Sequence, residues 1–157
     1  MSARFGEVPV RCCAVAAAII AARETDPQVL LLRRAGPIAA GAWGLVTGSI
    51  EPGETAPRAA RREIFEETGL AVARLFTTGL TETFYLAHDN TINLMPIFVA
   101  FVPTPAAVTL DHGSDAYRWC GLEDAIDLMH FAGQRRAITD IWRDFVICVP
   151  EAFREVP

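Results

Sequence analysis

Three glutamates, Glu63, Glu66 and Glu67, stand close together in a stretch whose residues favour a helix. With about 3.6 residues per turn, their side chains fall within an arc of roughly 100° on one helix face. Like charges at this spacing destabilise a helix, and carboxylates near its C-terminus also oppose the macrodipole. A divalent cation would reverse this cost, and hard carboxylate oxygens suit Mg²⁺, with Mn²⁺ as a second candidate. An acidic helix face is also typical of a solvated surface, so the glutamates alone leave both interpretations open.

The helix that carries the glutamates is expected over residues 56–68. Thr55 can cap its start, Pro57 fits the first turn, where its missing N–H is harmless, and Gly69 supplies a C-terminal stop. Three small residues lie on the same face, one and two turns earlier: Ala56, Ala59 and Ala60. We therefore expect an acidic face that is open to another backbone or to a ligand.

The spacing around these glutamates is specific. The positions that matter are, in order, Gly48, Glu54, Arg62-Glu63-Ile64, Glu66-Glu67 and Gly69-Leu70. A chance match to such a pattern in a chain of this length is on the order of one in ten million. The pattern resembles the box of the Nudix hydrolase family at every specified position. The resemblance implies an α/β fold, namely a Nudix-type α/β/α sandwich with a mixed β-sheet between helices.

Carried over residue by residue, the resemblance implies four Mg²⁺ ligands: the backbone carbonyl of Gly48 and the side chains of Glu63, Glu66 and Glu67. The same glutamates and Arg62 would be the catalytic residues, Glu54 would help to orient them, and water would be the nucleophile. For Arg62, a purely structural salt bridge is as reasonable as a direct catalytic role. The chemistry is consistent, because a cation neutralises an anionic diphosphate and a glutamate with few other partners can accept a proton.

A longer set of residues is similar to one branch of the family, the dATP or dihydroneopterin triphosphate pyrophosphohydrolases. This set comprises residues 30–34, 43–63, 117–119 and 134–136. On this resemblance Arg34 and Thr47 would touch the substrate. Arg34 is expected to act as a fork for phosphate at the end of a strand, with a solvated charge as the alternative.

One departure from that branch lies in the loop before residues 117–119. Relatives often carry a Glu-His pair where this chain has Gly113 and Ser114, so the usual outlying carboxylate is missing. Its replacement could come from three residues of the same loop, Asp111, His112 or Asp115, and the alternative is a site that works with the box glutamates alone. We favour Asp115, because a base next to a rigid strand is better positioned. Three aromatic side chains could stack on a base or pack in the core: Trp43, Phe84 and Tyr85.

The remaining pattern predicts a single domain over residues 1–157, with no internal repeat or linker. Before the box helix we expect strands at 12–22 and 28–33, a turn between them at 24–27 and a loop at 35–44. After it we expect strands at 75–86 and 92–102, joined by a turn at 88–90, and a short strand at 117–120. Two helices should follow, at 123–129 and 134–149. The first two strands should form a hairpin, and helices should cover both sides of the sheet.

Charge and composition exclude several classes of protein. The formal net charge is −5, and all 14 basic residues are Arg, in runs no longer than pairs, so duplex nucleic acid is not expected as a partner. Residues 12–22 follow Arg4 and Arg11 and have the length of a signal-peptide core, but they are too short to span a bilayer. A buried central strand is the preferred interpretation, and no membrane association is expected.

The chain has four cysteines: Cys12, Cys13, Cys120 and Cys148. They form no Cys-x-x-Cys pair, which excludes zinc knuckles and thioredoxin-like motifs. We expect buried thiols in a reducing cytosol, and hence a cytoplasmic protein.

These observations predict a Mg²⁺-dependent pyrophosphohydrolase that cleaves a phosphoanhydride bond of a nucleoside triphosphate or of another nucleoside diphosphate linked to a further group. A dinucleoside polyphosphate and a nucleotide sugar remain alternative substrates. Two other classes are an isomerase of isoprenoid diphosphates, for which Cys120 is the candidate cysteine, and a non-catalytic nucleotide sensor, which the intact box disfavours. A homodimer is left open.

Overall fold

The computed structural model describes residues 6–22 and 25–157. Arg4 and Glu24, which entered the predictions above, lie outside the described residues. The strands are β1 (Val10–Arg11), β2 (Ala14–Ala21), β3 (Gln28–Arg34), β4 (Trp43–Gly44), β5 (Val46–Ser49), β6 (Leu75–Leu86), β7 (Thr91–Val102), β8 (Ser114–Cys120) and β9 (Glu155–Val156). The helices are α1 (Ala56–Thr68), α2 (Leu122–Leu128) and α3 (Ala132–Ile141), followed by a π-helical segment (Trp142–Ile147) and a 3₁₀ turn (Ala152–Arg154).

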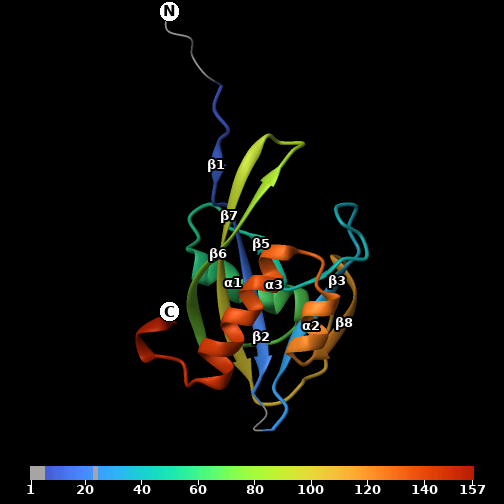
Figure 1. Ribbon diagram of the computed structural model, residues 1–157, viewed down its shortest axis with the longest axis vertical. Coiled ribbons are helices and arrows are strands. Elements are labelled where there is room, and N and C mark those ends of the chain that lie inside the picture. The colour runs from blue at the N-terminus through green and yellow to red at the C-terminus, as the bar shows by residue number, and fades with distance from the viewer. Residues whose placement is uncertain (1–5, 23–24) are drawn as a thin grey trace, which may run out of the picture.

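Within the described residues, all strands join one mixed sheet. Its main order is β4-β3-β2-β7-β6-β9, and β1, β5 and β8 pair with β7, β2 and β3, respectively. β2 runs parallel to β7 and antiparallel to β3, so the predicted opening hairpin is confirmed. β6 and β7 form the long predicted hairpin, which extends beyond the body of the molecule in Figure 1.

The central strand β2 changes partner along its length. Its last residues, Ile20 and Ala21, pair with β3, whereas its first residues, from Ala14 to Ala17, pair with β5. β3 and β5 therefore diverge from a common neighbour, and the sheet opens between them. This split positions the candidate site described below, because residues from both strands face the opening.

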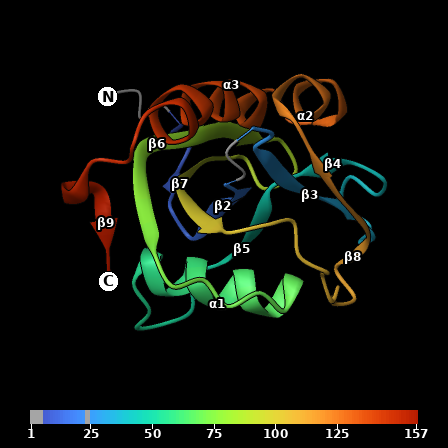
Figure 2. The same ribbon diagram turned by 90° about the horizontal axis from the view of Figure 1, so that it is seen from below.

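Helices cover both faces of the sheet, with α1 on one side and α2 and α3 on the other (Figure 2). The predicted α/β/α sandwich is thus confirmed. The alternation of side chains along β2 divides the core, because Val15 and Ile19 face the α1 layer while Ala18 and Ile20 face the α2–α3 layer. Both cores are fully buried at their centres.

Several boundaries differ from the predictions. The box helix matches residue for residue, but α3 starts at Ala132 and ends at Ile141, where a π-helical segment takes over. The final segment is therefore not one regular helix. β8 begins at Ser114, three residues earlier than predicted, because it pairs with β3 up to Arg34. The turn at residues 88–90 is present, with Asn90 at a φ of 50°.

The prediction for the cysteines is wrong in part. All four are free thiols, but only Cys120 is buried, and Cys12, Cys13 and Cys148 are exposed. Cys12 and Cys13 precede β2 instead of belonging to it. Residues 14–21 do form the buried central strand that was preferred over a signal peptide. Among the described residues, no helix is long and apolar enough to cross a membrane.

Candidate active site

Helix α1 carries the three glutamates, and its ends are set largely as the local residues predict. Gly69 adopts a left-handed conformation with φ 71°, and its N–H donates to the carbonyl of Phe65. Pro57 lies in the first turn. Thr55 occupies the N-cap position with extended backbone, but its side chain makes no capping hydrogen bond, so this part of the prediction is wrong.

The small residues on the acidic face serve packing instead of ligand access. Ala59 and Ala60 are fully buried, together with Ile64, where α1 lies against the sheet. Of the two expectations for these positions, the close approach of another backbone is confirmed, whereas access for a ligand is wrong. Their small size lets the helix backbone come close to the sheet, and this brings Glu63 against β5.

Glu63 lies directly against Gly48 of β5. A Cβ atom at Gly48 would overlap with Cγ, Cδ and Oε1 of Glu63, so only glycine leaves room for this side chain. The Glu63 side chain is 13% exposed, and burial raises the pKa of its carboxyl group although Arg62 lowers it. Gly48 and Glu63, which the family resemblance assigned to the same cation, are thus also in close contact in space.

Arg62 is hydrogen-bonded through every N–H group that it has. Nε and Nη2 form a fork on Glu54, with both distances 3.0 Å. Nη1 donates to Glu63 at 2.7 Å and to Glu66 at 3.1 Å, and Nη2 also donates to the carbonyl of Ser49 at 2.7 Å. A guanidinium group has five N–H donors, so none is left for a substrate. The geometry supports the structural interpretation of Arg62 over direct contact with the substrate.

Glu67 is half-buried and faces the opening between β3 and β5. The pKa of its carboxyl group is raised to about 8, first by burial and then by the charges of Glu63 and Asp111. Arg34 and a hydrogen bond from the backbone of Thr47 act in the opposite direction. A carboxylate in this setting lacks sufficient positive charge nearby, which is the environment that a bound cation would relieve.

The arrangement offers oxygen ligands to a cation but is not a ready-made cage. Glu66 is 53% exposed and is held by Arg62. Within residues 6–22 and 25–157, no three Asp, Glu, His or Cys side chains are gathered as a metal-binding group. The contact between Gly48 and Glu63 and the coupling of Glu63 with Glu67 place hard oxygen donors side by side. This donor set fits a hard divalent ion.

A cavity of about 180 Å³ lies beside these glutamates. Its polar lining includes Arg34, Thr47, Glu67, Ser114 and Gln134. Arg34 and Thr47, which the family resemblance assigned to the substrate, therefore share one cavity with a box glutamate. Arg34 stands at the end of β3, where its Nε donates to the carbonyl of Ile38 at 3.3 Å.

Gln134 is a site residue to which sequence reasoning gave no role. It is 2% exposed at the start of α3, and its Oε1 accepts a hydrogen bond of 2.9 Å from the backbone N–H of Leu45. A Cβ at Gly44 would lie 2.7 Å from the same oxygen, so the two segments touch closely. The only signal in the sequence was its place in the Gln134-Arg135-Arg136 run, which carried the family resemblance.

The structure does not support Asp115 as the outlying acid. Its carboxylate forms a 2.7 Å ion pair with Arg33, on the exposed strand pair β3–β8. Asp111 is the loop carboxylate whose charge acts on Glu67, and its Oδ1 accepts the N–H of Gly113 at 2.9 Å. His112 is exposed. The reason for the difference is that the ion pair with Arg33 turns Asp115 away, which residue spacing cannot show.

The three aromatic candidates for base stacking have other surroundings. Trp43 and Phe84 pack against the core on the α2–α3 side. Tyr85 is 55% exposed near the hairpin turn, and its hydroxyl donates to Asn90 at 2.9 Å. The aromatic ring that lines the cavity is Phe131, which was not among the candidates.

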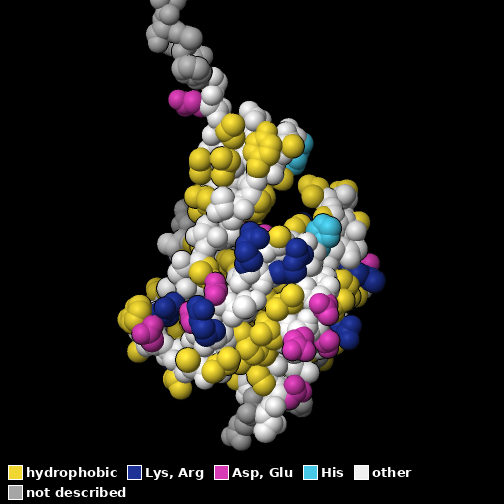
Figure 3. Space-filling model, in the orientation of Figure 1, with side chains coloured by type: hydrophobic (Ala, Val, Ile, Leu, Met, Phe, Trp, Pro, Cys, Tyr) yellow, Lys and Arg dark blue, Asp and Glu magenta, His cyan; other side chains and the backbone are white. Residues whose placement is uncertain are grey.

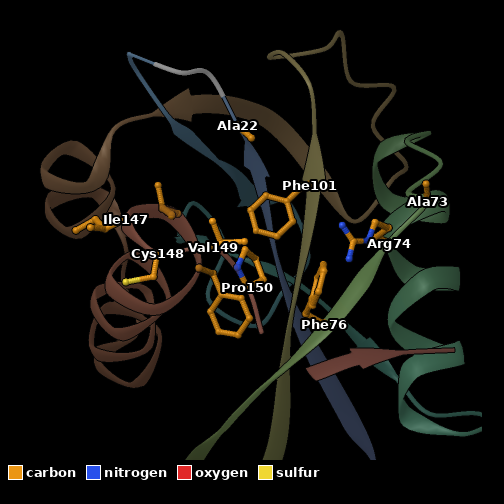
Figure 4. Close-up of a pocket in the computed structure, with 11 residues that line it drawn as sticks. Ala22, Ala73, Arg74, Phe76, Phe101, Ile147, Cys148, Val149 and Pro150 are labelled. Atoms are coloured by element: carbon orange, nitrogen blue, oxygen red, sulfur yellow. The ribbon is translucent and has the colours of Figure 1, made fainter. Parts of the chain in front are cut away.

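A larger cavity, of about 410 Å³, lies elsewhere in the molecule. It is formed by the end of β2, by β6 and β7, and by the C-terminal segment, with Phe76, Phe101 and Pro150 around it (Figure 4). Its walls are mainly apolar, and Arg74, the one charged residue among the described residues that line it, is paired with Glu155 at 2.8 Å. None of the predicted site residues lines it, so its larger volume does not make it the site of the chemistry.

A model of the NUDIX domain family matches residues 14–141. The chain belongs to this family. The match covers the central strand, the box helix and α3, and thus every residue assigned above from the box. Nudix hydrolases generally use divalent metal ions, in agreement with the oxygen donors on α1 and β5.

Three relatives illustrate the similarity. An octanoyltransferase from Myxococcus xanthus is 33% identical over 131 residues, which are 79% of this chain and 35% of that protein. A dihydroneopterin triphosphate diphosphatase from Escherichia coli strain K12 is 46% identical over 54 residues, 34% of each protein. The matches thus span about a third of the length of these curated relatives. The structure of the E. coli dihydroneopterin triphosphate pyrophosphohydrolase aligns with a TM-score of 0.72 and 30% identity, covering 90% of this chain and 99% of that one.

Proposed function

We propose that this Nudix domain is a Mg²⁺-dependent pyrophosphohydrolase acting on a nucleoside triphosphate or a similar triphosphate. The observation that carries the proposal is the cavity in which Glu67 faces Arg34 and Thr47, with Glu63 and Gly48 directly behind it. A carboxylate that could hold a cation and a guanidinium group line the same cavity, and both the cation and the guanidinium group would stabilise an anionic diphosphate. The name of the E. coli relative, a triphosphate pyrophosphohydrolase, supports the same class.

Each residue of the box has a role in the proposal. The carbonyl oxygen of Gly48 and the carboxylates of Glu63, Glu66 and Glu67 would hold the ion, and Mn²⁺ could replace Mg²⁺. A bound ion would neutralise the diphosphate and favour attack at phosphorus. Arg62 is a positioning residue, because its five hydrogen bonds hold three carboxylates and the β5 backbone.

The reaction itself is a hydrolysis. Arg34 would bind the non-bridging oxygens of the diphosphate through its fork, and Thr47 would orient the same group. Water attacks one phosphorus atom, a new P–O bond forms, and the anhydride P–O bond breaks so that the leaving phosphate keeps the electron pair. Glu67 would be one of the residues that hold the ion, and its carboxylate could also accept the proton of the attacking water.

The buried thiol of Cys120 does not favour the isomerase alternative. Cys120 is 3% exposed, burial raises the pKa of its thiol to about 11, and it does not line the cavity. A thiol with that pKa is neutral at physiological pH and is a poor nucleophile. The four free thiols support a reducing compartment, and we propose a cytoplasmic location.

The experiment is a panel of triphosphates, dinucleoside polyphosphates and nucleotide sugars, assayed with Mg²⁺ and with products identified. We expect a triphosphate to be the best substrate and to release pyrophosphate. Glu67→Gln should lower kcat by at least about 10²-fold without unfolding the protein, because it removes a ligand charge while keeping the shape. Glu123→Gln, on the exposed side of α2, is the matched control and should behave as the wild type.

Two outcomes would contradict the proposal. Near-normal kcat of Glu67→Gln at saturating Mg²⁺ would remove this residue from the metal site. Tight nucleotide binding without turnover on the whole panel would support the sensor alternative instead.

A further inference from the structure

The pairing of β3 with β8 contains an irregularity at the edge of the cavity. Arg33 of β3 pairs with Ala116 of β8 in a regular antiparallel register. The next residue, Arg34, pairs with Ser114 and not with Asp115, so Asp115 is the extra residue of a β-bulge. Bulges are frequent next to active sites, where they change the direction of a side chain.

The bulge decides which side chain of β8 faces the cavity. Leu32 and Arg34 line the cavity from β3, whereas Arg33, which lies between them, faces the opposite side of the strand. Ser114 lines the same cavity, and Asp115 does not. Asp115 instead pairs with Arg33, with 2.7 Å between the Arg33 Nε and the Asp115 Oδ1. The two strands thus bring an arginine and a serine to the cavity and place the carboxylate outside it.

A regular register would give a different site. Without the extra residue, Arg34 would lie directly opposite Asp115, because each step along β3 is matched by one step back along β8. Opposite charges at such cross-strand positions attract each other, so the carboxylate would pair with the guanidinium group. Among residues 6–22 and 25–157, Arg34 forms no ion pair with Asp or Glu, and its side chain makes one hydrogen bond, to the neutral carbonyl of Ile38. The bulge therefore leaves the charge of Arg34 available to an anion.

The hydroxyl group of Ser114 is also available. It forms no hydrogen bond with any described residue, whereas every fully buried side-chain oxygen or nitrogen in this part of the chain has a partner. The hydroxyl group is therefore in contact with solvent, although the residue as a whole is half-buried. A hydroxyl group can donate one hydrogen bond, and phosphate oxygens are strong acceptors for hydroxyl and guanidinium donors. Arg34 and Ser114 thus offer neighbouring donors to one anionic group.

The neutrality of Ser114 matters for the charge of the cavity. Glu67 already brings one carboxylate to the lining. A second carboxylate opposite Arg34 would neutralise the guanidinium group and repel a phosphate. Serine adds a hydrogen-bond donor at this position without adding negative charge.

The surface on this side of the molecule is accessible to an anion. Figure 3 shows a hollow between the end of the β6–β7 hairpin and the loop that precedes β4, with basic side chains at its lower edge. Gly36 of that loop lines the cavity. An anion that approaches over this face meets positive charge, although the chain carries a formal net charge of −5.

We propose that Ser114 is a specificity-determining residue: its hydroxyl group donates a hydrogen bond to the phosphate group that Arg34 binds, and the bulge at Asp115 keeps both donors free of a carboxylate. The two donors contact phosphate oxygens, so this subsite selects for the charge of the substrate and not for its organic part. This inference rests on the proposed function, because it places the phosphates of the substrate in the cavity that Arg34 shares with Glu67.

The test uses methylenediphosphonate, a diphosphate analogue that resists hydrolysis, with binding measured by calorimetry in the presence of Mg²⁺. Ser114→Ala should weaken binding by about 10-fold, the effect of one hydrogen bond to a charged acceptor, whereas Ser114→Thr keeps the hydroxyl group and should bind as the wild type. Ser114→Asp should weaken binding by at least about 10²-fold, because its carboxylate pairs with Arg34 and repels the probe. Thr104→Ala and Thr104→Asp are the matched controls, since Thr104 is exposed after β7 and does not line the cavity.

Steady-state kinetics with the best triphosphate give a second readout. Ser114→Ala should raise KM by about 10-fold and leave kcat nearly unchanged, because the hydrogen bond is present in the bound substrate and in the transition state alike. The inference is overturned if the wild type does not bind the probe, if Ser114→Ala binds it as the wild type does, or if Ser114→Asp binds no more weakly than Ser114→Ala. Equal losses in Ser114→Ala and Ser114→Thr would also overturn it, because they would show that the position only supports packing. Binding of the probe that depends on Ser114, without hydrolysis of any substrate, would support this inference and contradict the proposed function.

Discussion

Replacing Gly48 by alanine is the most direct perturbation of the site, because a single methyl group there meets Glu63. The added Cβ would overlap with Cγ, Cδ and Oε1 of Glu63, which form the outer part of its side chain, so the whole carboxylate end has to move. Glu63 must leave its rotamer, and its 2.7 Å hydrogen bond with Arg62 must break. The substitution therefore acts on the metal site from the opposite strand.

The expected size of the effect follows from three contributions. Gly48 lies in β5 without a positive φ, so alanine is tolerated by the backbone and gains about 0.4–1 kcal/mol through the unfolded state. Overpacking costs about 1–3 kcal/mol, and the lost hydrogen bond adds about 0.5–1 kcal/mol, reduced by its partial exposure. The cost of the clash and of the lost hydrogen bond exceeds the gain through the unfolded state, so the free energy of unfolding should fall by about 1–2 kcal/mol. For a chain of this size, Tm would drop by about 2–8 °C.

Thermal unfolding and steady-state kinetics would measure both consequences. We expect kcat to fall by about 10²-fold, because a ligand displaced by an ångström no longer matches the reacting geometry. Gly121→Ala is the matched control, since Gly121 has a φ of −67° and open space around its Cβ direction. Combining Gly48→Ala with Glu63→Asp, which retracts the carboxylate by one methylene, should restore part of the lost stability. If Gly48→Ala is as stable and active as the control, the close packing of Glu63 on β5 is not what organises the site.

Three further predictions concern other parts of the molecule. Asp111→Asn should lower kcat by about 10-fold, whereas Asp115→Asn should not, and the opposite result would restore Asp115 as the outlying acid. A reductant should leave Tm unchanged, because all four cysteines are free thiols, and a large drop would indicate a disulfide. Burial of Glu82 on β6 raises the pKa of its carboxyl group, so its contribution to stability is present below the unfolded pKa of about 4.3 and is lost as pH rises through the folded pKa. Glu82→Gln should therefore have a higher Tm than the wild type near neutral pH and no such advantage near pH 4, and a constant difference in Tm across this range would contradict the burial argument.

Local residue patterns were sufficient for the elements of the fold. The box helix was predicted residue for residue, because Pro57 and Gly69 act on the backbone of their own neighbours. The buried strand β2 and the long β6–β7 hairpin were also predicted, since an apolar run and a turn each depend on residues that are consecutive in the sequence. The junction of α3 with the π-helical segment was missed, because apolar spacing does not distinguish these two helical forms over a few residues.

The tertiary structure decided which side chains share the site. β2 pairs first with β5 and then with β3, and this change of partner opens the cavity that joins Arg34 and Thr47 to Glu67. Ion pairing with Arg33 removed Asp115 from the site, and a hydrogen bond from Leu45 brought Gln134 into it. These contacts join residues about 80 to 90 positions apart in the chain. Spacing along a sequence constrains only near neighbours, so contacts at such separations depend on how the strands and helices pack.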